Sequence, residues 1–441
     1  MDFNKNTLTY KDIIIFWLPL LATLIMMMAE APFLAAVIAR LSYPKFNLAA
    51  FGLAYSIAMF FESPIIMIMS ASNALVKDKT SFIKLRNFTY ALNAIITVLM
   101  LVLLIPPIFQ FIMERVIGLH ADISRITHIA CMILILWPAA IGYRRFYQGI
   151  LIRNNLTRKV SYGTVVRLTM MAVTALVFYI FFDIPGAHVG AAALSAGVLA
   201  EATASRYMVR KIVHQLKLSR VDAYHEKPLT YKEITRFYAP LASSSVLSVG
   251  IRPLVTFFMG RSRYPIESLA VLPVINGLIG IFFTFGWSFQ DVCIALMGEK
   301  YKNFDKLKNF ALALGLFATA ALSVIAFTPL STIWFHYVSG LTLELTDFSL
   351  TPARIIFIIP FLHVGVCFLQ ASLVAAKYTK AIIKSTGIEV AVIVIFLSIG
   401  IIYFNMVGVI AAVSALLLGR FFSNVYLSIP VVRIIGGKGE N

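Results

Sequence analysis

Apolar runs long enough to cross a lipid bilayer recur along the whole chain, from Ile13 to the neighbourhood of Val432. A helix needs about 18 or more such residues to span roughly 30 Å of hydrocarbon. The chain is 60% hydrophobic and only 13% charged, whereas a soluble domain is about 45–50% apolar and about 25% charged. No soluble packing arrangement hides that much apolar surface. The sequence therefore predicts an all-α polytopic membrane protein.

The formal net charge of +18 does not indicate a nucleic-acid partner, because the basic residues lie in short loops and form no stripe on a soluble domain. Every second connection is basic, and by the positive-inside rule these loops and both termini are expected to face the cytoplasm of a plasma or inner membrane. The basic connections carry Lys77, Lys79, Lys84 and Arg86; Arg153, Arg158 and Lys159; Arg210, Lys211, Lys217, Arg220 and Lys227; Lys300, Lys302, Lys306 and Lys308; and Lys377, Lys380 and Lys384.

The remaining compositional signals exclude several classes of protein. Cys131, Cys293 and Cys367 lie inside apolar runs without C-x-x-C spacing, so neither a zinc site nor a disulfide framework is predicted. No G-x-x-x-x-G-K-[ST] stretch is present to hold ATP phosphates, which disfavours ATP-driven transport. The first apolar run is too long for a signal peptide and is expected to be retained.

The second half of the chain repeats the first. Residues 8–13 (LTYKDI) return as 229–234 (LTYKEI), Tyr43-Pro44 returns as Tyr264-Pro265, and residues 84–88 return as 306–310 after one residue of slip. An even number of helices in each copy makes the copies parallel repeats, related by a pseudo-two-fold axis along the membrane normal. We assign residues 1–212 to an N-terminal lobe, 213–228 to a cytoplasmic linker and 229–441 to a C-terminal lobe.

Each copy contains six predicted helices, which gives 12 in the chain. They are expected at residues 12–39, 48–76, 86–113, 123–151, 160–182 and 187–212, and at residues 233–260, 269–298, 307–337, 351–376, 382–404 and 407–433.

Two six-helix halves of this size resemble the multidrug and toxic compound extrusion (MATE) family of the MOP superfamily. Three stretches are similar to its progressive ankylosis branch: residues 48–56 (LAAFGLAYS) running into Phe60-Phe61, Arg252-Pro253 with Arg261 downstream, and Phe285-Gly286-Trp287. The resemblance implies a V-shaped protein with a central cavity that opens to either side of the membrane in turn.

The resemblance also implies two substrate classes. MATE-like proteins extrude organic cations or other amphiphiles in exchange for H⁺ or Na⁺, whereas the ankylosis branch is associated with export of small anions such as pyrophosphate, nucleotides or citrate. Many MATE-like exporters carry an acidic residue in the seventh helix, where this chain has Arg252. This departure weakens the case for a simple cation-drug mechanism.

Acidic residues within the predicted spans are candidate ion-coupling sites, since a charge near the bilayer centre costs about 2.5–3.5 kcal/mol even on a mild scale. Glu30 lies two residues before Pro32, and Glu62 lies two residues before Pro64. A proline can kink a helix and expose a carbonyl beside the acid. Asp291 is a further candidate. For Glu30 the alternatives are a carboxylate wetted near a helix end or a structural pair with an arginine, and Glu62 is weighed in a similar way. For Asp291 the alternative is a structural or interfacial role.

Arg252, Arg167, Arg144 and Glu389 are candidate substrate-binding residues. Arg252 precedes Pro253, a second candidate kink, and its place in the repeat is close to that of Glu30. An ion pair between the two that opens and closes is one hypothesis, and a static pair within one half is the other. Arg144 and Arg167 can bind phosphate or carboxylate, or extend to the headgroups. Glu389 replaces Arg167 in the second copy, whereas Glu201 is assigned a structural or interfacial role.

The sequence thus predicts a secondary-active exporter that works by alternating access and extrudes a small organic solute or drug in exchange for H⁺ or Na⁺. Export of small anions is the alternative, and a channel or an intramembrane enzyme is a more distant one. No clustered nucleophile, base or metal ligand set indicates catalysis. We expect no catalytic residue, no metal and no cofactor besides the coupling ion, and a monomer whose partners are a small-molecule substrate and the lipid bilayer.

Overall fold

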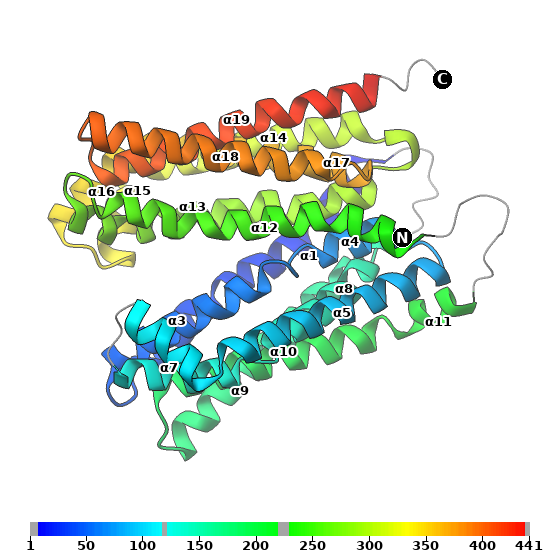
Figure 1. Cartoon of the computed structure of the whole chain (residues 1–441). Coiled ribbons are helices and arrows are strands. Elements are labelled where there is room, and N and C mark those ends of the chain that lie inside the picture. Colours follow the sequence, from blue (N-terminus) through cyan, green and yellow to red (C-terminus); the bar gives the residue numbers. More distant parts are fainter. Residues whose placement is uncertain (1–7, 117–120, 219–228, 437–441) are drawn as a thin grey trace. The chain divides into compact units, whose positions relative to one another are not determined.

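The computed structural model describes residues 8–116, 121–218 and 229–436, and these residues are almost entirely helical (Figure 1). In these ranges the only β-type pairing is an isolated bridge between Arg263 and Val407. The prediction of an all-α protein is confirmed.

The helices of the first half of the chain are α1 (Tyr10–Met28), α2 (Glu30–Ile38), α3 (Pro44–Glu62), α4 (Ile68–Leu75), α5 (Lys79–Leu103), α6 (Pro106–Gln110), the π-helix η1 (Phe111–Val116), α7 (Ala121–Ile133), α8 (Trp137–Arg153), α9 (Thr157–Phe181), α10 (Gly186–Met208) and α11 (Arg210–Leu218).

The helices of the second half are α12 (Tyr231–Met259), α13 (Pro265–Leu296), the 3₁₀ helix η2 (Glu299–Tyr301), α14 (Phe304–Phe327), α15 (Leu330–Thr332), the π-helix η3 (Ile333–Val338), α16 (Leu343–Ile355), the 3₁₀ helix η4 (Ile356–Ile358), α17 (Ile359–Ala375), α18 (Lys380–Ser398), the π-helix η5 (Ile399–Tyr403) and α19 (Gly408–Gly436).

Ten helical segments of the described chain are long and apolar enough to cross a membrane, and the shorter apolar segment Phe46–Glu62 adds to them. Two of the 12 predicted spans are not among these ten segments. The second is interrupted between α3 and α4, where Pro64 lies. The sixth corresponds to α10, which contains His188, Glu201 and several glycines among its apolar residues, and these lower its mean hydropathy.

The chain divides into two compact units that differ from the sequence halves. Unit 1 comprises Met1–Trp17 with Ala239–Asn441, and unit 2 comprises Leu18–Tyr238. The boundaries thus fall inside α1 and α12, so the first turns of each half's first helix pack with helices of the other half. Of the predicted linker 213–228, residues 213–218 end α11 and residues 219–228 lie outside the described residues.

The sequence repeat is visible in local structure. Tyr43 and Tyr264 both adopt a left-handed backbone, with φ of 51° and 54°, immediately before the prolines that begin α3 and α13. In unit 2, the Oδ1 atom of Asn47 accepts a hydrogen bond over 3.1 Å from a backbone N–H in the first turn of α10. In unit 1, the Oγ atom of Ser268 accepts the equivalent bond from α19, also over 3.1 Å. Each repeat therefore fixes its second helix to its sixth in the same way.

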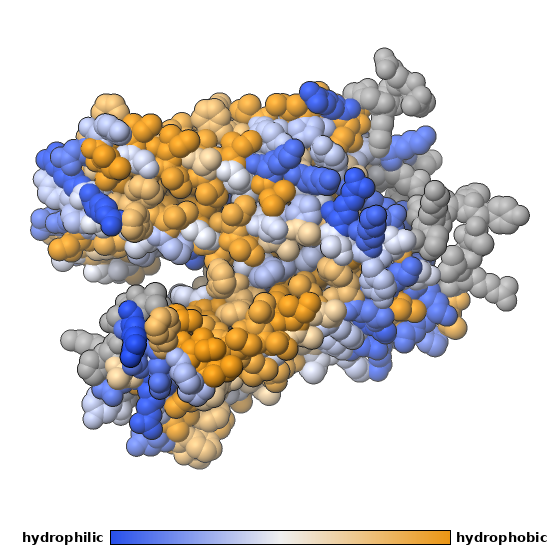
Figure 2. Space-filling model, in the orientation of Figure 1, coloured by the Kyte–Doolittle hydropathy of each residue, from blue (hydrophilic) through white to orange (hydrophobic). Residues whose placement is uncertain are grey.

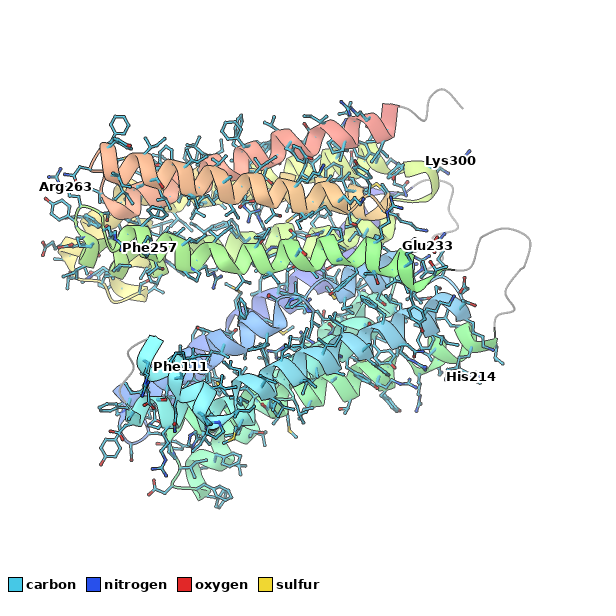
Figure 3. All side chains as sticks on the ribbon, in the orientation of Figure 1. Phe111, His214, Glu233, Phe257, Arg263 and Lys300 are labelled. Carbon is cyan, nitrogen blue, oxygen red and sulfur yellow. The ribbon has the colours of Figure 1, made fainter. Side chains whose placement is uncertain are left out.

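Both units have an apolar middle zone with hydrophilic residues gathered at the ends (Figure 2). In unit 1, Arg263 lies at one end and Lys300 at the other (Figure 3). In unit 2, Phe111 and His214 likewise lie at opposite ends. Such banding is expected of helices that cross a bilayer, because their middle turns face hydrocarbon and their ends meet water.

Candidate functional site

Glu30 is the first residue of α2, directly after the break at Ala29 that separates α2 from α1. Pro32 in the first turn of α2 has no backbone N–H to donate, which accounts for an interruption at this point. The Glu30 side chain is buried, and its Oε2 accepts a hydrogen bond over 2.5 Å from Nη2 of Arg167 on α9. The acid at the break is therefore tied to a neighbouring helix by an ion pair.

Glu201 on α10 lies between two arginines. Its Oε2 pairs with Nη1 of Arg144 on α8 and lies 3.6 Å from Nη1 of Arg167. Its Oε1 accepts hydrogen bonds from Nε2 of Gln148, over 3.0 Å, and from Oγ1 of Thr164, over 3.2 Å. Glu201 has no exposed surface. These contacts join four helices through one buried set of side chains, which we call the charge network: Glu30, Arg144, Gln148, Thr164, Arg167 and Glu201.

Glycines let the helices of the charge network approach closely. A Cβ atom on Gly197 of α10 would lie 2.9 Å from the backbone oxygen of Arg167, and one on Gly163 of α9 would lie 3.4 Å from Cγ of Glu201. With α9 and α10 this close, little room is left for water around the charged groups. Charges inside such packing must satisfy one another, because water does not.

The charge network is not fully hydrogen-bonded. Within the described residues, Oε1 of Glu30, Nε of Arg144 and the Nε and Nη1 atoms of Arg167 are buried without a hydrogen-bond partner. Native proteins leave few buried polar atoms unpaired, and each one calls for an explanation. Spare donors and an acceptor at one place allow a proton to be taken up, or the ion pairs to be exchanged.

Glu62, the last residue of α3, is buried in the same unit. Across the described part of the chain, no basic nitrogen lies within 4.0 Å of its carboxylate. Glu62 therefore lies in the same unit as the charge network and makes no direct ion pair with it.

The other predicted residues lie in unit 1. Asp291 is buried on α13, whereas Arg252 is exposed on α12, which continues through Pro253 without interruption. Glu389 on α18 pairs with Arg420 on α19, with Nε and Oε1 3.3 Å apart. The structure thus gathers Glu30, Arg144 and Arg167 within unit 2, whereas Asp291, Arg252 and Glu389 belong to unit 1. The acidic partners of Arg167 are Glu30 and Glu201, so its ion pairs lie within one half.

The Glu389–Arg420 pair mirrors the charge network with opposite polarity. In unit 2 the base stands on the fifth helix of the repeat, as Arg167, and the acid on the sixth, as Glu201. In unit 1 the acid stands on the fifth and the base on the sixth. A glycine is again the point of close approach, since a Cβ on Gly419 would lie 3.2 Å from the backbone oxygen of Glu389.

Sequence reasoning missed Glu201, Gln148 and Thr164 as members of the site. The sequence assigns Glu201 a structural or interfacial role, although it lies near the middle of the predicted span 187–212. A usable signal was the spacing of Arg144 and Gln148, which at i and i+4 occupy one face of α8. In the described residues, no group of three or more His, Cys, Asp or Glu side chains is placed to hold a metal ion.

The sequence matches no known protein family and no curated protein. The fold, however, matches solved structures over nearly the whole chain. A MOP superfamily transporter from Pyrococcus furiosus, described as having a binding pocket of reverse polarity that suggests a different function, is 15% identical with a TM-score of 0.76, covering 96% of both chains. A multidrug resistance MATE family transporter in an outward-facing conformation is 14% identical with a TM-score of 0.74, covering 96% of both chains.

A eukaryotic MATE transporter is 13% identical with a TM-score of 0.74, covering 96% of this chain and 95% of that one. The chain therefore has the multi-pass fold seen in MATE and MOP superfamily transporters. The narrower resemblance to the progressive ankylosis branch receives no support from these structures.

Proposed function

We propose that this protein is a secondary-active transporter that exports a small organic solute in exchange for an ion, by exposing its binding site to the two sides of the membrane in turn. The observation that carries the proposal is the charge network, in which Glu30, Arg167, Glu201 and Arg144 are buried on four helices. The shared fold of solved transporters supports the same assignment.

Buried ion pairs are a costly way to stabilise helices, because desolvation offsets much of the attraction between the charges. Ionisable groups inside membrane segments therefore usually serve an ion or substrate pathway. Glu30 is well suited to such work, since it lies at a helix break and has one carboxylate oxygen without a partner. Among the members of the charge network, it is our first candidate for the coupling site.

We favour H⁺ as the coupling ion and keep Na⁺ as the alternative. A sodium ion beside Oε2 of Glu30 would need the place that Nη2 of Arg167 fills, 2.5 Å away. A proton needs no such space. Protonation cancels the charge of Glu30, and Arg167 then retains Glu201 as its acidic partner at 3.6 Å. The helix α2 would thus have two arrangements, one paired to α9 and one released.

The substrate class is open to two proposals. The broader family resemblance favours an organic cation or other amphiphile. Export of a small anion, such as pyrophosphate, a nucleotide or citrate, is favoured by two arginines: across the described residues, neither Arg252 nor Arg145 has a carboxylate within 4.0 Å. Guanidinium groups without acidic partners can bind phosphate or carboxylate through paired hydrogen bonds.

Flux measurements on the purified protein in liposomes test the proposal. We expect a cationic dye or a labelled anion to accumulate against its gradient only when a proton gradient is imposed. Glu30→Gln and Glu62→Gln should insert normally and lose gradient-driven flux, while Glu344→Gln, an exposed control on α16, should retain it.

Other flux results would change the proposal or contradict it. Coupled transport that survives in both Glu30→Gln and Glu62→Gln removes these residues as coupling sites. Drive by a sodium gradient alone replaces the proton with Na⁺. Flux that only dissipates a solute gradient, under every imposed ion gradient, indicates a channel and contradicts the proposal.

A further inference from the structure

Two grooves lie on the surface of unit 2, one on each flank of α10. The first, about 560 Å³ in volume, runs between α8 and α10 and is lined by Tyr143, Leu199, Ala202, Arg206 and Arg210 among others. The second, about 730 Å³, runs between α9 and α10. Thr203 and Tyr207 line both grooves and form the ridge between them.

Two arginines stand at one end of the first groove. The guanidinium of Arg206 lies 5.3 Å from the ring centroid of Tyr147, and that of Arg210 lies 4.1 Å from that of Tyr207. These aromatic contacts hold both cations in place. Within residues 8–116, 121–218 and 229–436, neither arginine has a carboxylate within 4.0 Å. Their charge is therefore available to an anionic ligand.

The remainder of both grooves is apolar. Val166, Met170 and Val173 line the second groove and are exposed on α9, and Leu199 is exposed in the first. In a membrane-spanning bundle, exposed side chains of this kind contact acyl chains. A soluble anion would fill the basic end and leave the two apolar grooves empty. A diacyl lipid can place its headgroup at the basic end and one acyl chain in each groove.

The basic residues at one end of unit 2 indicate which leaflet of the membrane supplies the ligand. Arg206 and Arg210 lie at the junction of α10 and α11, beside Lys159, whose Nζ donates to the backbone oxygen of Met208 over 3.4 Å. Hydrophilic residues gather at this end, near α11 (Figure 2). Basic pockets between membrane helices at the cytoplasmic surface bind anionic headgroups, and the basic loops are those that the positive-inside rule places there.

We propose that this surface is a binding site for one anionic phospholipid of the leaflet at the basic end. The phosphate lies between Arg206 and Arg210, and one acyl chain occupies each groove on either side of the ridge formed by Thr203 and Tyr207. The guanidinium groups can take the phosphate oxygens through paired hydrogen bonds. The site is separate from the charge network and does not depend on what the protein transports.

Native mass spectrometry of the full-length protein in detergent tests this site. The protein is titrated with dioleoyl phosphatidylglycerol, with dioleoyl phosphatidylcholine and with glycerol 3-phosphate. We expect phosphatidylglycerol to bind at least tenfold more tightly than phosphatidylcholine. Arg206→Gln/Arg210→Gln should remove that preference, whereas Arg158→Gln/Lys211→Gln, which deletes two charges at the same end outside the grooves, should keep it.

A second variant tests the grooves without changing any charge. Thr203→Trp places a bulky ring on the ridge and should weaken binding of both phospholipids at least several-fold, with size-exclusion profile and melting temperature unchanged. Thr203→Trp still tests the proposed lipid site if Arg206→Gln/Arg210→Gln fails to fold. The proposal is overturned if the two double variants lose affinity equally, if Thr203→Trp binds lipid as the wild type does, or if glycerol 3-phosphate displaces the lipid at equal concentration.

Discussion

Trp17 and Tyr238 occupy equivalent positions in the two repeats, and each donates one hydrogen bond at the point where its helix passes from one compact unit to the other. Nε1 of Trp17 donates to Oγ of Ser288 over 2.7 Å, and the hydroxyl of Tyr238 donates to the backbone oxygen of Pro64 over 2.6 Å. The first turns of α1 and α12 are thus fixed to helices of the other sequence half by matching contacts.

The aromatic packing at these points follows the same symmetry. Trp17 meets Phe310 edge-on with ring centroids 5.9 Å apart, and Tyr238 meets Phe88 edge-on at 5.5 Å. Phe310 and Phe88 are themselves equivalent residues of the repeat. Edge-to-face pairs at such distances add to the stabilisation from burial alone. At both crossings, the points where α1 and α12 pass from one unit to the other, a hydrogen bond and an edge-on aromatic pair therefore stand together, and Trp17 has a second aromatic neighbour in Phe285 at 6.0 Å.

Removal of these hydrogen bonds should destabilise the protein modestly. We expect Trp17→Phe and Tyr238→Phe each to lower the free energy of unfolding by about 0.5–1.5 kcal/mol, the net contribution of a typical hydrogen bond. Tyr231→Phe, at an exposed tyrosine on the same helix as Tyr238, should leave it unchanged. Thermal unfolding of the purified protein in detergent measures the effect, and equal melting temperatures for all three variants would contradict the assignment.

Prolines follow the crossings at equivalent positions, Pro19 in α1 and Pro240 in α12. A proline inside a helix removes one backbone hydrogen bond and costs about 3 kcal/mol relative to alanine. Such weak points suit helices that must bend when two units move. We expect Pro19→Ala and Pro240→Ala to raise thermal stability and to slow solute flux in liposomes by several-fold.

Pro430 provides the control for that experiment, because it lies inside α19, a helix that stays within one unit. Pro430→Ala should raise stability without slowing flux. If all three variants slow flux alike, general stiffening of the protein is responsible and the crossings have no special part in transport.

The ion pair between Arg167 and Glu30 should show strong energetic coupling. Removal of one member of a buried pair leaves an uncompensated charge and costs about 3–5 kcal/mol. We therefore expect Arg167→Met to destabilise the protein by that amount, and Glu30→Met/Arg167→Met to be more stable than Arg167→Met alone. Denaturant unfolding of the two single variants and the double variant completes the cycle. Additive losses would show that the pair does not act as a unit.

The sequence alone could predict the fold but not the partners within the site. Span length, the repeat and the all-α class follow from hydrophobic burial, which is set by local composition. The pairing of Glu30 with Arg167 depends on how helices far apart in sequence are rotated against each other. Glu201 shows the difference clearly: the sequence assigns it a structural or interfacial role, yet the neighbours of α10 leave it with no exposed surface and two arginine partners. The sequence repeat places Trp17 and Tyr238 each in its own half, so their contacts with the other half could not be predicted from it.

Gly149 on α8 offers a test of helix packing next to the charge network. A Cβ atom there would lie 2.4 Å from the backbone oxygen of Met69 and 2.7 Å from Cβ of Ser72, so α8 and α4 would have to move apart. We expect Gly149→Ala to lower the free energy of unfolding by about 1–3 kcal/mol, the usual cost of overpacking. Gly52 on α3 has no atom within 4 Å of such a Cβ, and Gly52→Ala should instead stabilise the protein by up to about 1 kcal/mol, since alanine is the better helix former. Thermal unfolding distinguishes the two, and a Gly149→Ala variant as stable as Gly52→Ala would mean that α8 and α4 are not packed this closely.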